Sequence, residues 1–231
     1  MLRRIKYNSH TSIIMYKPSG LLWEDDIQYI GHLDVLSKLK EENFHPNVIY
    51  DIGSCEGNWT EMATTLWPEC EFYLFDANED LEELYEEKKY NYHLGLLSNT
   101  NNEQVKYYYN ETFIAGNSYY KELTDAYSDD TYRILNSVTL DKVIDNNNWP
   151  LPDLIKIDAQ GSELDILEGG SKILSNAKYL IVELQHIEYN DNAPLFEESI
   201  DIIENAGWKL INSKFSSSDY SIDADYLFER V

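Results

Sequence analysis

The chain reads Val48-Ile49-Tyr50-Asp51-Ile52-Gly53-Ser54-Cys55-Glu56-Gly57-Asn58 over a stretch that joins a short apolar run to a glycine-containing loop. A run of this length that ends at a glycine is typical of a buried strand, because both of its faces pack against apolar neighbours. A helix is expected to follow over residues 58–66, before Pro68. The stretch therefore predicts a strand–loop–helix unit, the building block of parallel sheets.

Apolar runs and helical patterns alternate along the rest of the chain. Further strands are expected at residues 72–75, 92–95, 154–157, 179–184, 208–211 and 226–228. Helices are expected at residues 21–39, 81–88, 139–144, 162–174 and 196–206, with an extra extended piece at 105–109. The alternation predicts an α/β fold with a mostly parallel sheet. We expect a lead-in segment with a helix over residues 1–45 and one domain over residues 46–231.

The composition indicates a folded and strongly acidic protein. Of the 231 residues, 43% are hydrophobic and 13% aromatic, which is enough for a core and argues against a disordered chain. The 42 acidic residues outnumber the 18 lysines and arginines, so the net charge is −24. This charge disfavours nucleic acids and anionic membranes as partners. Neutral or cationic small molecules, or another protein, are the expected partners.

Cysteine content and hydropathy indicate the compartment. The chain has two cysteines, Cys55 and Cys70, without a Cys–His cluster, which argues against a disulfide scaffold and a structural zinc site. The basic start continues into polar residues rather than the apolar stretch of a signal peptide. No run approaches the roughly 18 apolar residues of a membrane span. We expect a soluble, cytoplasmic protein.

The loop after the first strand limits the kind of ligand. Gly53 and Gly57 allow a tight turn and a close approach of the backbone to a ligand. A dinucleotide-binding loop would read G-x-G-x-x-G, but here Cys55 takes the second glycine position, and Glu56 would repel a pyrophosphate. Both features disfavour an NAD-dependent oxidoreductase. Asp51 suits a ligand with an ammonium or sulfonium charge, although an ordinary strand–helix turn would read the same way.

A second acid follows the next strand. Asp76 stands 25 residues after Asp51, where a carboxylate can accept hydrogen bonds from both hydroxyls of a ribose. The alternative is a solvated acid at the start of an acidic helix. Together with the loop, Asp76 predicts a nucleoside ligand without phosphates, of which S-adenosylmethionine is the common example.

The most informative stretch covers residues 151–170. Lys156 lies inside the apolar run of the fourth strand, so its charge should reach a carboxylate or a ligand. Asp158 and Gln160 follow at the strand's end and are expected to face the cleft. Ser162 to Asp165 reads as a capping box, and the following helix is expected to end near Gly169 and Gly170.

This stretch resembles the signature of the FkbM family of S-adenosylmethionine-dependent methyltransferases, approximately (I/L)-K-(I/L)-D-(V/I)-(E/Q)-G-x-E-x-x-(V/L)-L-x-G. The match extends to residues 51–60, the Gly116-Asn117-Ser118 turn, residues 139–141 and residues 181–184. One departure is Asp76-Ala77, where the family more often has Glu followed by Pro. The resemblance implies a Rossmann-like class I methyltransferase fold, with a mostly parallel seven-stranded sheet between helices, and S-adenosylmethionine as cofactor.

The resemblance also implies residue roles. Cofactor contacts would come from several strand ends: Asp51, Gly53, Ser54, Gly57, Asn58, Asp76, Ala77, Leu96, Ser98, Asn117 and Asp158. The catalytic group would be Asp158, Gln160, Glu183 and His186. A lone histidine is more often structural, but one that follows a strand end and faces Asp158 is as often functional as structural. The tyrosines at 107–109 and 119–120 could stack on a sugar but more often only pack.

The resemblance implies O-methylation, with a sugar or glycan hydroxyl as the expected acceptor. A hydroxyl is a weak nucleophile, so a base must take its proton, and Asp158 or His186 is the candidate. A divalent cation on Asp158 and Glu183 could acidify the hydroxyl instead, but two carboxylates are few for a full site, and we expect no metal. The sequence is also compatible with methylation of a small natural product or of a nucleic acid, and with a non-catalytic acidic binding protein.

Overall fold

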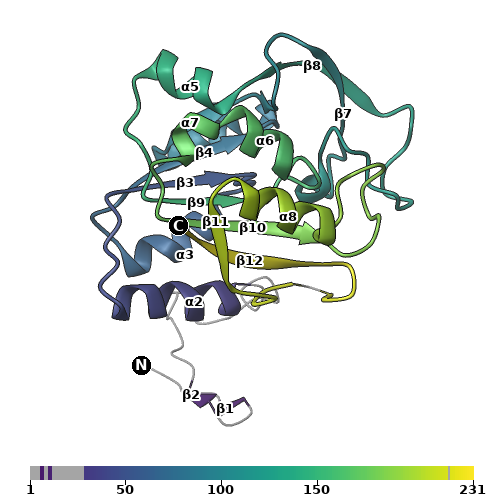
Figure 1. Ribbon diagram of the computed structural model, residues 1–231. Coiled ribbons are helices and arrows are strands. Elements are labelled where there is room, and N and C mark those ends of the chain that lie inside the picture. The colour runs from purple at the N-terminus through teal and green to yellow at the C-terminus, as the bar shows by residue number, and fades with distance from the viewer. Residues whose placement is uncertain (1–5, 8–9, 12–28, 218) are drawn as a thin grey trace.

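The computed structural model describes residues 6–7, 10–11, 29–217 and 219–231 (Figure 1). Strands β1 (Lys6–Tyr7) and β2 (His10–Thr11) form a short antiparallel pair. The lead-in helix expected at residues 21–39 is α2 (Ile30–Glu41), and residues 21–28 lie outside the described part of the chain. The division into a lead-in of residues 1–45 and a domain of residues 46–231 stays a prediction.

A seven-stranded, mostly parallel sheet forms the centre of the molecule, as the sequence predicts (Figure 1). Its spatial order is β11 (Trp208–Asn212), β12 (Asp223–Arg230), β10 (Tyr179–Gln185), β9 (Leu154–Ile157), β3 (Val48–Ile52), β4 (Glu71–Asp76) and β5 (Asn91–Leu94). The five strands from β10 to β5 run parallel, while β12 is antiparallel to both β10 and β11. The carboxyl ends of the parallel strands therefore meet at one edge.

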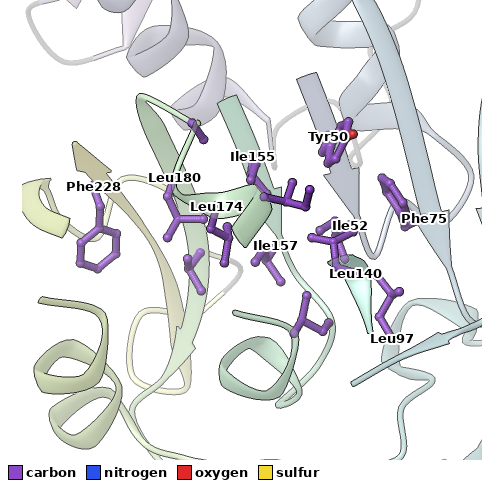
Figure 2. Close-up of a cluster of buried hydrophobic side chains, with 14 of the residues drawn as sticks. Tyr50, Ile52, Phe75, Leu97, Leu140, Ile155, Ile157, Leu174, Leu180 and Phe228 are labelled. Carbon is purple, nitrogen blue, oxygen red and sulfur yellow. The ribbon is translucent and has the colours of Figure 1, made fainter. Parts of the chain in front are cut away.

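Helices cover both faces of this sheet, and each face has its own apolar core (Figure 1). One face packs against α2, α3 (Asn58–Leu66) and α4 (Glu82–Lys88), which follows the 3-10 turn η1 (Glu79–Leu81). The other face packs against α5 (Leu140–Asn147), α6 (Glu163–Gly169), α7 (Ser171–Leu174) and α8 (Phe196–Asn205). Figure 2 shows this second core, where Ile155 and Ile157 of β9 lie near Leu174 and Leu180. Burial on both faces explains why β3 and β9 read as continuous apolar runs.

A second, three-stranded sheet is inserted between β5 and α5. Its order is β6 (Leu96–Leu97), β8 (Tyr132–Val138) and β7 (Gln104–Tyr108), and η2 (Ile114–Gly116) lies in the connection between β7 and β8. Strand β7 corresponds to the extended piece expected at residues 105–109, whereas β8 was not predicted. Its apolar residues divide between the two faces, with Ile134 exposed and Leu135 half-buried, so the strand lacks the period-two alternation that marks a strand in the sequence.

The helix expected over residues 162–174 is two helices, α6 and α7. The break lies where α6 contacts the loop after β6: a Cβ on Gly169 would lie 2.2 Å from the carbonyl oxygen of Ser98. The capping box predicted at Ser162 to Asp165 is wrong, because the Ser162 hydroxyl donates to the carbonyl of Ala159 at 2.9 Å. Across the described ranges, no helix combines the length and apolarity needed to cross a membrane.

Candidate active site

A cleft of about 550 Å³ opens at the carboxyl ends of β3, β4 and β9. The strand-end loops supply one wall through Gly53, Asp76 and Asp158, and the inserted segment supplies another through Tyr107, Asn117 and Tyr119. The sequence thus predicts the correct edge of the sheet.

The loop after β3 is held by its glycines for a reason that the sequence did not show. Gly53 has a φ of +73°, and a Cβ at this position would lie 1.7 Å from the carbonyl oxygen of Asp158. The glycine is therefore required by the packing of β3 against β9, whatever the ligand. Cys55 lines the cleft with a φ of +47°, a left-handed conformation that is uncommon for a non-glycine residue.

Asp76 lies at the end of β4, half-buried and lining the cleft. Its Oδ2 accepts a hydrogen bond from the backbone N–H of Cys55, and its Oδ1 accepts one from that of Asn78, both at 2.9 Å. Burial raises the pKa of this carboxyl, although the two N–H groups act in the opposite direction. Each oxygen of an ionised carboxylate has more than one lone pair, so Asp76 can still accept hydrogen bonds from a ligand.

Lys156 is buried in β9 and lies between two carboxylates, which confirms the expectation from its charge. Its Nζ lies 3.2 Å from Oδ2 of Asp158 and 3.6 Å from Oδ1 of Asp51. Burial acts to raise the pKa of Asp158, but Lys156 and several hydrogen bonds outweigh it and hold this pKa below its ordinary value. Asp158 is therefore an ionised carboxylate at the cleft wall.

Asp51 has a different place from the one expected. Its side chain is fully buried beneath α3, where Thr60 Oγ1 donates to it at 2.7 Å, and it does not line the cleft. Burial raises the pKa of this carboxyl, against the effect of Lys156. Asp51 forms one side of the Lys156 ion pairs, and its contact with the cofactor stays a prediction.

Gln160 connects two carboxylates at the ends of β9 and β10. Its side-chain Nε2 donates to Asp158 Oδ1 at 3.0 Å and to Glu183 Oε2 at 2.9 Å. Burial and the neighbouring Asp158 raise the pKa of Glu183 well above its ordinary value. Gln160 has a left-handed φ of +54°, so its backbone holds a conformation that costs free energy. This strained loop brings Asp158, Gln160 and Glu183 together, as the sequence predicts.

The loop that carries Gln160 is held from below by Glu163. Oε1 of Glu163 accepts hydrogen bonds from the backbone N–H groups of Ala159 at 2.8 Å and Gly161 at 3.1 Å. Glu163 is buried, and this burial raises its pKa to about 7 even though the two N–H groups favour the ionised form. Glu163 is thus the residue that shapes the loop, in place of the predicted cap by Ser162.

His186 lies away from the cleft. Its Nδ1 is 2.9 Å from the carbonyl oxygen of Tyr220, which can only accept, so this nitrogen carries the hydrogen. Its Nε2 therefore accepts from the hydroxyl of Tyr226 at 2.6 Å. Both ring nitrogens therefore form hydrogen bonds, which join the end of β10 to β12 and to the loop before it. These two hydrogen bonds disfavour His186 as the catalytic base, which stays a prediction.

Four other residues predicted to bind the cofactor lie outside the cleft lining: Ser54, Gly57, Asn58 and Ser98. Ser54 Oγ donates to the carbonyl of Phe75 and bonds the hydroxyl of Tyr85, so it joins β3 to β4 and α4. Ser98 is buried under α6, and Asn58 is the exposed first residue of α3. A Cβ on Gly57 would lie 2.9 Å from the ring of Tyr90. These positions have structural roles.

The predicted residues that do line the cleft are Gly53, Asp76, Ala77, Leu96, Asn117, Asp158 and Gln160. Sequence reasoning missed several of their neighbours, among them Leu97, Ile114 and Ile166. The tyrosine-rich stretches were the available signal for the inserted wall, since Tyr107 and Tyr119 line it. Tyr119 and Tyr120 both donate to Asp165 Oδ2, at 2.6 and 2.9 Å, which ties this wall to α6.

Comparison with known proteins agrees with this architecture. The family model described as "Methyltransferase FkbM domain" matches residues 51–210. Hexuronic acid methyltransferase AglP of Haloferax volcanii is 24% identical over 161 residues, which cover 67% of this chain and 62% of that protein. The chain thus spans less than two thirds of the length of this curated relative.

Two solved structures share the fold. A methyltransferase FkbM from Methylobacillus flagellatus KT has 13% identity and a TM-score of 0.50, over 79% of this chain and 43% of the other. An S-adenosylmethionine-dependent methyltransferase from Clostridium acetobutylicum has 10% identity and a TM-score of 0.51, over 89% of this chain and 93% of the other.

The seven-stranded sheet, with a cleft at its carboxyl edge, defines a Rossmann-like class I methyltransferase fold. The chain belongs to the FkbM methyltransferase family, and S-adenosylmethionine is its cofactor.

Proposed function

We propose that the protein transfers the methyl group of S-adenosylmethionine to a hydroxyl oxygen of a sugar or glycan. The observation that carries this proposal is the pair of carboxylates, Asp158 and Glu183, joined by Gln160 at the carboxyl edge of β9 and β10. A hydroxyl acceptor needs a group that takes its proton, and this pair supplies one. The hexuronic acid methyltransferase among the relatives supports a sugar as the acceptor.

The residues of the cleft fit the cofactor. Leu96, Leu97 and Ile166 offer an apolar surface for the purine, and Asp76 has acceptor capacity for the ribose hydroxyls. Ala77, next to Asp76, lines the same end, while Gly53, Asn117 and Asp158 line the part nearer β9. The negative charge of Asp158 suits the cationic end of the cofactor. We assign cofactor binding to these residues, with Gln160 as the link to the acceptor side.

The residues around β9 would orient the reaction. When bound, the cofactor supplies an electrophilic methyl group on a sulfonium centre. Lys156 keeps Asp158 ionised, because its Nζ lies 3.2 Å from that carboxylate in a buried environment. Gln160, held by Asp158 and Glu183, keeps the two carboxylates in place beside the cleft. An acceptor hydroxyl that enters here meets a proton acceptor as its oxygen attacks the methyl carbon.

Cofactor binding can be tested with the two cysteines. Cys55 lines the cleft and Cys70 does not, while burial raises the pKa of both thiols to about 12. S-adenosylhomocysteine should slow alkylation of Cys55 by iodoacetamide and leave that of Cys70 unchanged, with mass spectrometry as the readout. NADH and ATP should protect neither cysteine. Equal protection of both cysteines, or of neither, would remove the cleft as the cofactor site.

Methyl transfer is tested with labelled S-adenosylmethionine and a panel of acceptors. The panel holds neutral sugars, amino sugars, hexuronic acids, nucleotide sugars, short glycans, phenolic natural products and RNA. We expect label on a sugar hydroxyl, located by mass spectrometry after acid hydrolysis. Label only on a phenol or on RNA would replace the sugar acceptor, and no label on any acceptor would contradict an enzymatic function.

A further inference from the structure

Three carboxylates occupy the neighbouring strands β9, β10 and β12, and of these three Asp158 is the one that lines the cleft. Glu183 of β10 is paired directly with Asp225 of β12, and Asp158 of β9 is joined to Glu183 through Gln160. Residues that pair directly across antiparallel strands carry their side chains on the same face of the sheet. Glu183 therefore has a carboxylate neighbour on each side.

Helix α2 and helix α3 cover this face and contact Asp225 through a fixed chain of side chains. His32 Nε2 lies 3.0 Å from Asp225 Oδ2, and the indole N–H of Trp59 donates to His32 Nδ1 at 3.1 Å. An indole nitrogen can only donate, so His32 Nδ1 must accept and the ring hydrogen lies on Nε2, pointing at Asp225. Trp59, His32 and Asp225 are 1%, 3% and 5% exposed, so water does not compete for these bonds.

Among the described residues, no lysine or arginine lies within ion-pair distance of Asp225, because Lys156 pairs with Asp51 and Asp158. His32 donates a hydrogen bond but, in the tautomer that Trp59 imposes, brings no positive charge. The other carboxylate oxygen, Oδ1, is buried and accepts no hydrogen bond from the described part of the chain. Trp59, His32 and Asp225 take no part in the proposed transfer of the proton to Asp158 or Glu183. They are nevertheless buried next to these two carboxylates.

The charged groups around Glu183 are predominantly acidic. Among the described residues, Asp158 faces it from β9, Asp223 and Asp225 from β12, and Glu163 from α6, while Tyr189 follows β10. Lys156 is shared between Asp51 and Asp158, so it stabilises Asp158 rather than Glu183. Burial, Asp158 and Asp225 all raise the pKa of Glu183, whereas the pKa of Asp158 is lowered. Because the ammonium of Lys156 lies 3.2 Å from Asp158 and pairs with it rather than with Glu183, Glu183 takes up a proton more readily than Asp158.

We propose that Glu183 is the proton acceptor of the methyl transfer, and that Trp59, His32 and Asp225 are positioning residues that set its basicity. This inference rests on the proposed function. As the acceptor oxygen bonds to the methyl carbon, the carbon–sulfur bond breaks and sulfur keeps the electron pair. The hydroxyl proton passes to an oxygen of Glu183, which gives a methyl ether, S-adenosylhomocysteine and a neutral Glu183.

The coupling between Glu183 and Asp225 can be measured without activity. A carboxyl whose folded-state pKa is raised binds its proton more tightly in the folded than in the unfolded protein, so it lowers stability as the pH rises above its ordinary pKa. Glu183→Gln removes this loss. Its Tm should match that of the parent protein near pH 5 and exceed it increasingly toward pH 8. In an Asp225→Asn background, the difference in Tm that Glu183→Gln produces at high pH should be smaller.

Glu229→Gln is the matched control, because Glu229 lies on the same face of β12 but pairs with Tyr179 at the opposite end. Glu229→Gln should leave unchanged the difference in Tm that Glu183→Gln produces at high pH. A difference in Tm that does not depend on pH, or that Asp225→Asn leaves intact, would overturn the coupling of these residues.

The catalytic part is tested by the pH dependence of kcat/KM with the acceptor found by the panel. Glu183→Gln should lower kcat by about 10²–10⁴-fold, with the Kd for S-adenosylhomocysteine unchanged. Asp225→Asn should shift the acidic limb of the profile about one pH unit lower, because Glu183 loses a negative neighbour. Trp59→Phe should shift it as well, because His32 Nδ1 loses the donor that fixes the ring hydrogen on Nε2, next to Asp225.

The outcomes separate this inference from the proposed function. If Glu183→Gln keeps its kcat while labelled methyl still reaches a sugar, Glu183 is not the proton acceptor but the proposed function stands. If Asp225→Asn lowers the rate without moving the acidic limb, Asp225 has only a structural role. If no acceptor takes up methyl, the catalytic part fails together with the proposed function, and the thermal experiment alone decides the coupling of Glu183 to Asp225.

Discussion

The site has two halves, one at the end of β4 and one beside the end of β10. Each half contains a carboxylate, but the two carboxylates are held by different kinds of partner. In the β4 half, Asp76 accepts from two backbone N–H groups, which are fixed in position and carry no charge that can be lost. In the β10 half, Glu183 is held by the side chain of Gln160 and lies among other acids. Backbone partners suit a group that only accepts hydrogen bonds, whereas acidic neighbours suit a group that takes up a proton. Lys156 lies between Asp51 and Asp158, pairs with both, and helps to hold the pKa of Asp158 below its ordinary value.

We expect the largest effect from Lys156, which lies between the two halves and pairs with Asp51 and Asp158. Lys156→Met leaves Asp51 fully buried without a cationic partner, and removing one member of a buried pair costs about 3–5 kcal/mol. Urea unfolding at pH 7 measures this loss. The double variant Lys156→Met/Asp51→Asn should recover most of it, because the fully buried position 51 then carries no charge, while Asp158, the other partner of Lys156, lies at the cleft. A double variant as unstable as the single one would show that packing, rather than charge, determines the effect.

Gly53 tests the contact between β3 and β9. Gly53→Ala places a Cβ 1.7 Å from the carbonyl of Asp158, and the left-handed φ adds strain, so we expect a loss of at least about 2–3 kcal/mol. Gly207→Ala is the matched control, because Gly207 also has a positive φ but its nearest neighbour would lie 3.6 Å away. Chemical unfolding of both variants separates the steric clash from the strain. Equal losses would contradict the clash.

Much of the fold could be predicted because β3 and β9 are buried on both faces. Continuous burial gives continuous apolar runs, and these locate the strand ends, hence Gly53, Asp76, Asp158 and Gln160. The direction of a single side chain is harder to predict, since consecutive residues of a strand point to opposite faces. His186 follows Gln185 and lies one residue out of phase with Glu183, which is why a histidine just after a strand did not reach the cleft.

Contacts between residues far apart in the sequence could not be predicted. His32 and Asp225 are 193 residues apart, and no local pattern around either one indicates the other. The left-handed conformation of Gln160 is equally hidden, because glutamine is not a residue type that marks such positions. Asp51 could be placed in its strand, but the burial of its carboxylate beneath Thr60 depends on how α3 packs.

Asp76 tests the β4 half. Asp76→Ala removes the acceptor assigned to the ribose and the partner of the Cys55 and Asn78 N–H groups, and should weaken S-adenosylhomocysteine binding about 10–100-fold. Asp80→Ala is the control, because Asp80 is an exposed acid nearby that pairs with Arg133 instead. Calorimetry on both variants and on Glu183→Gln sharpens the contrast, since only Asp76→Ala should change the Kd. A weaker Kd for Glu183→Gln would mean that the two halves are not separate.

The smallest expected effect concerns Glu163, which combines features of both halves: its partners are backbone N–H groups, as for Asp76, but burial raises its pKa to about 7. Because this pKa is higher in the folded than in the unfolded protein, the contribution of Glu163 to stability is largest below about pH 4.5 and is lost as the pH rises toward 7. Glu163→Gln keeps an acceptor oxygen for Ala159 and Gly161 but cannot ionise, so its free energy of unfolding should fall by about 1 kcal/mol less than that of the parent protein between pH 6 and pH 7. Urea unfolding at the two pH values measures this difference, with Glu168→Gln, an exposed acid of the same helix, as the control. An identical pH dependence in Glu163→Gln and the parent protein would show that the backbone N–H groups of the loop hold the pKa of Glu163 at its ordinary value.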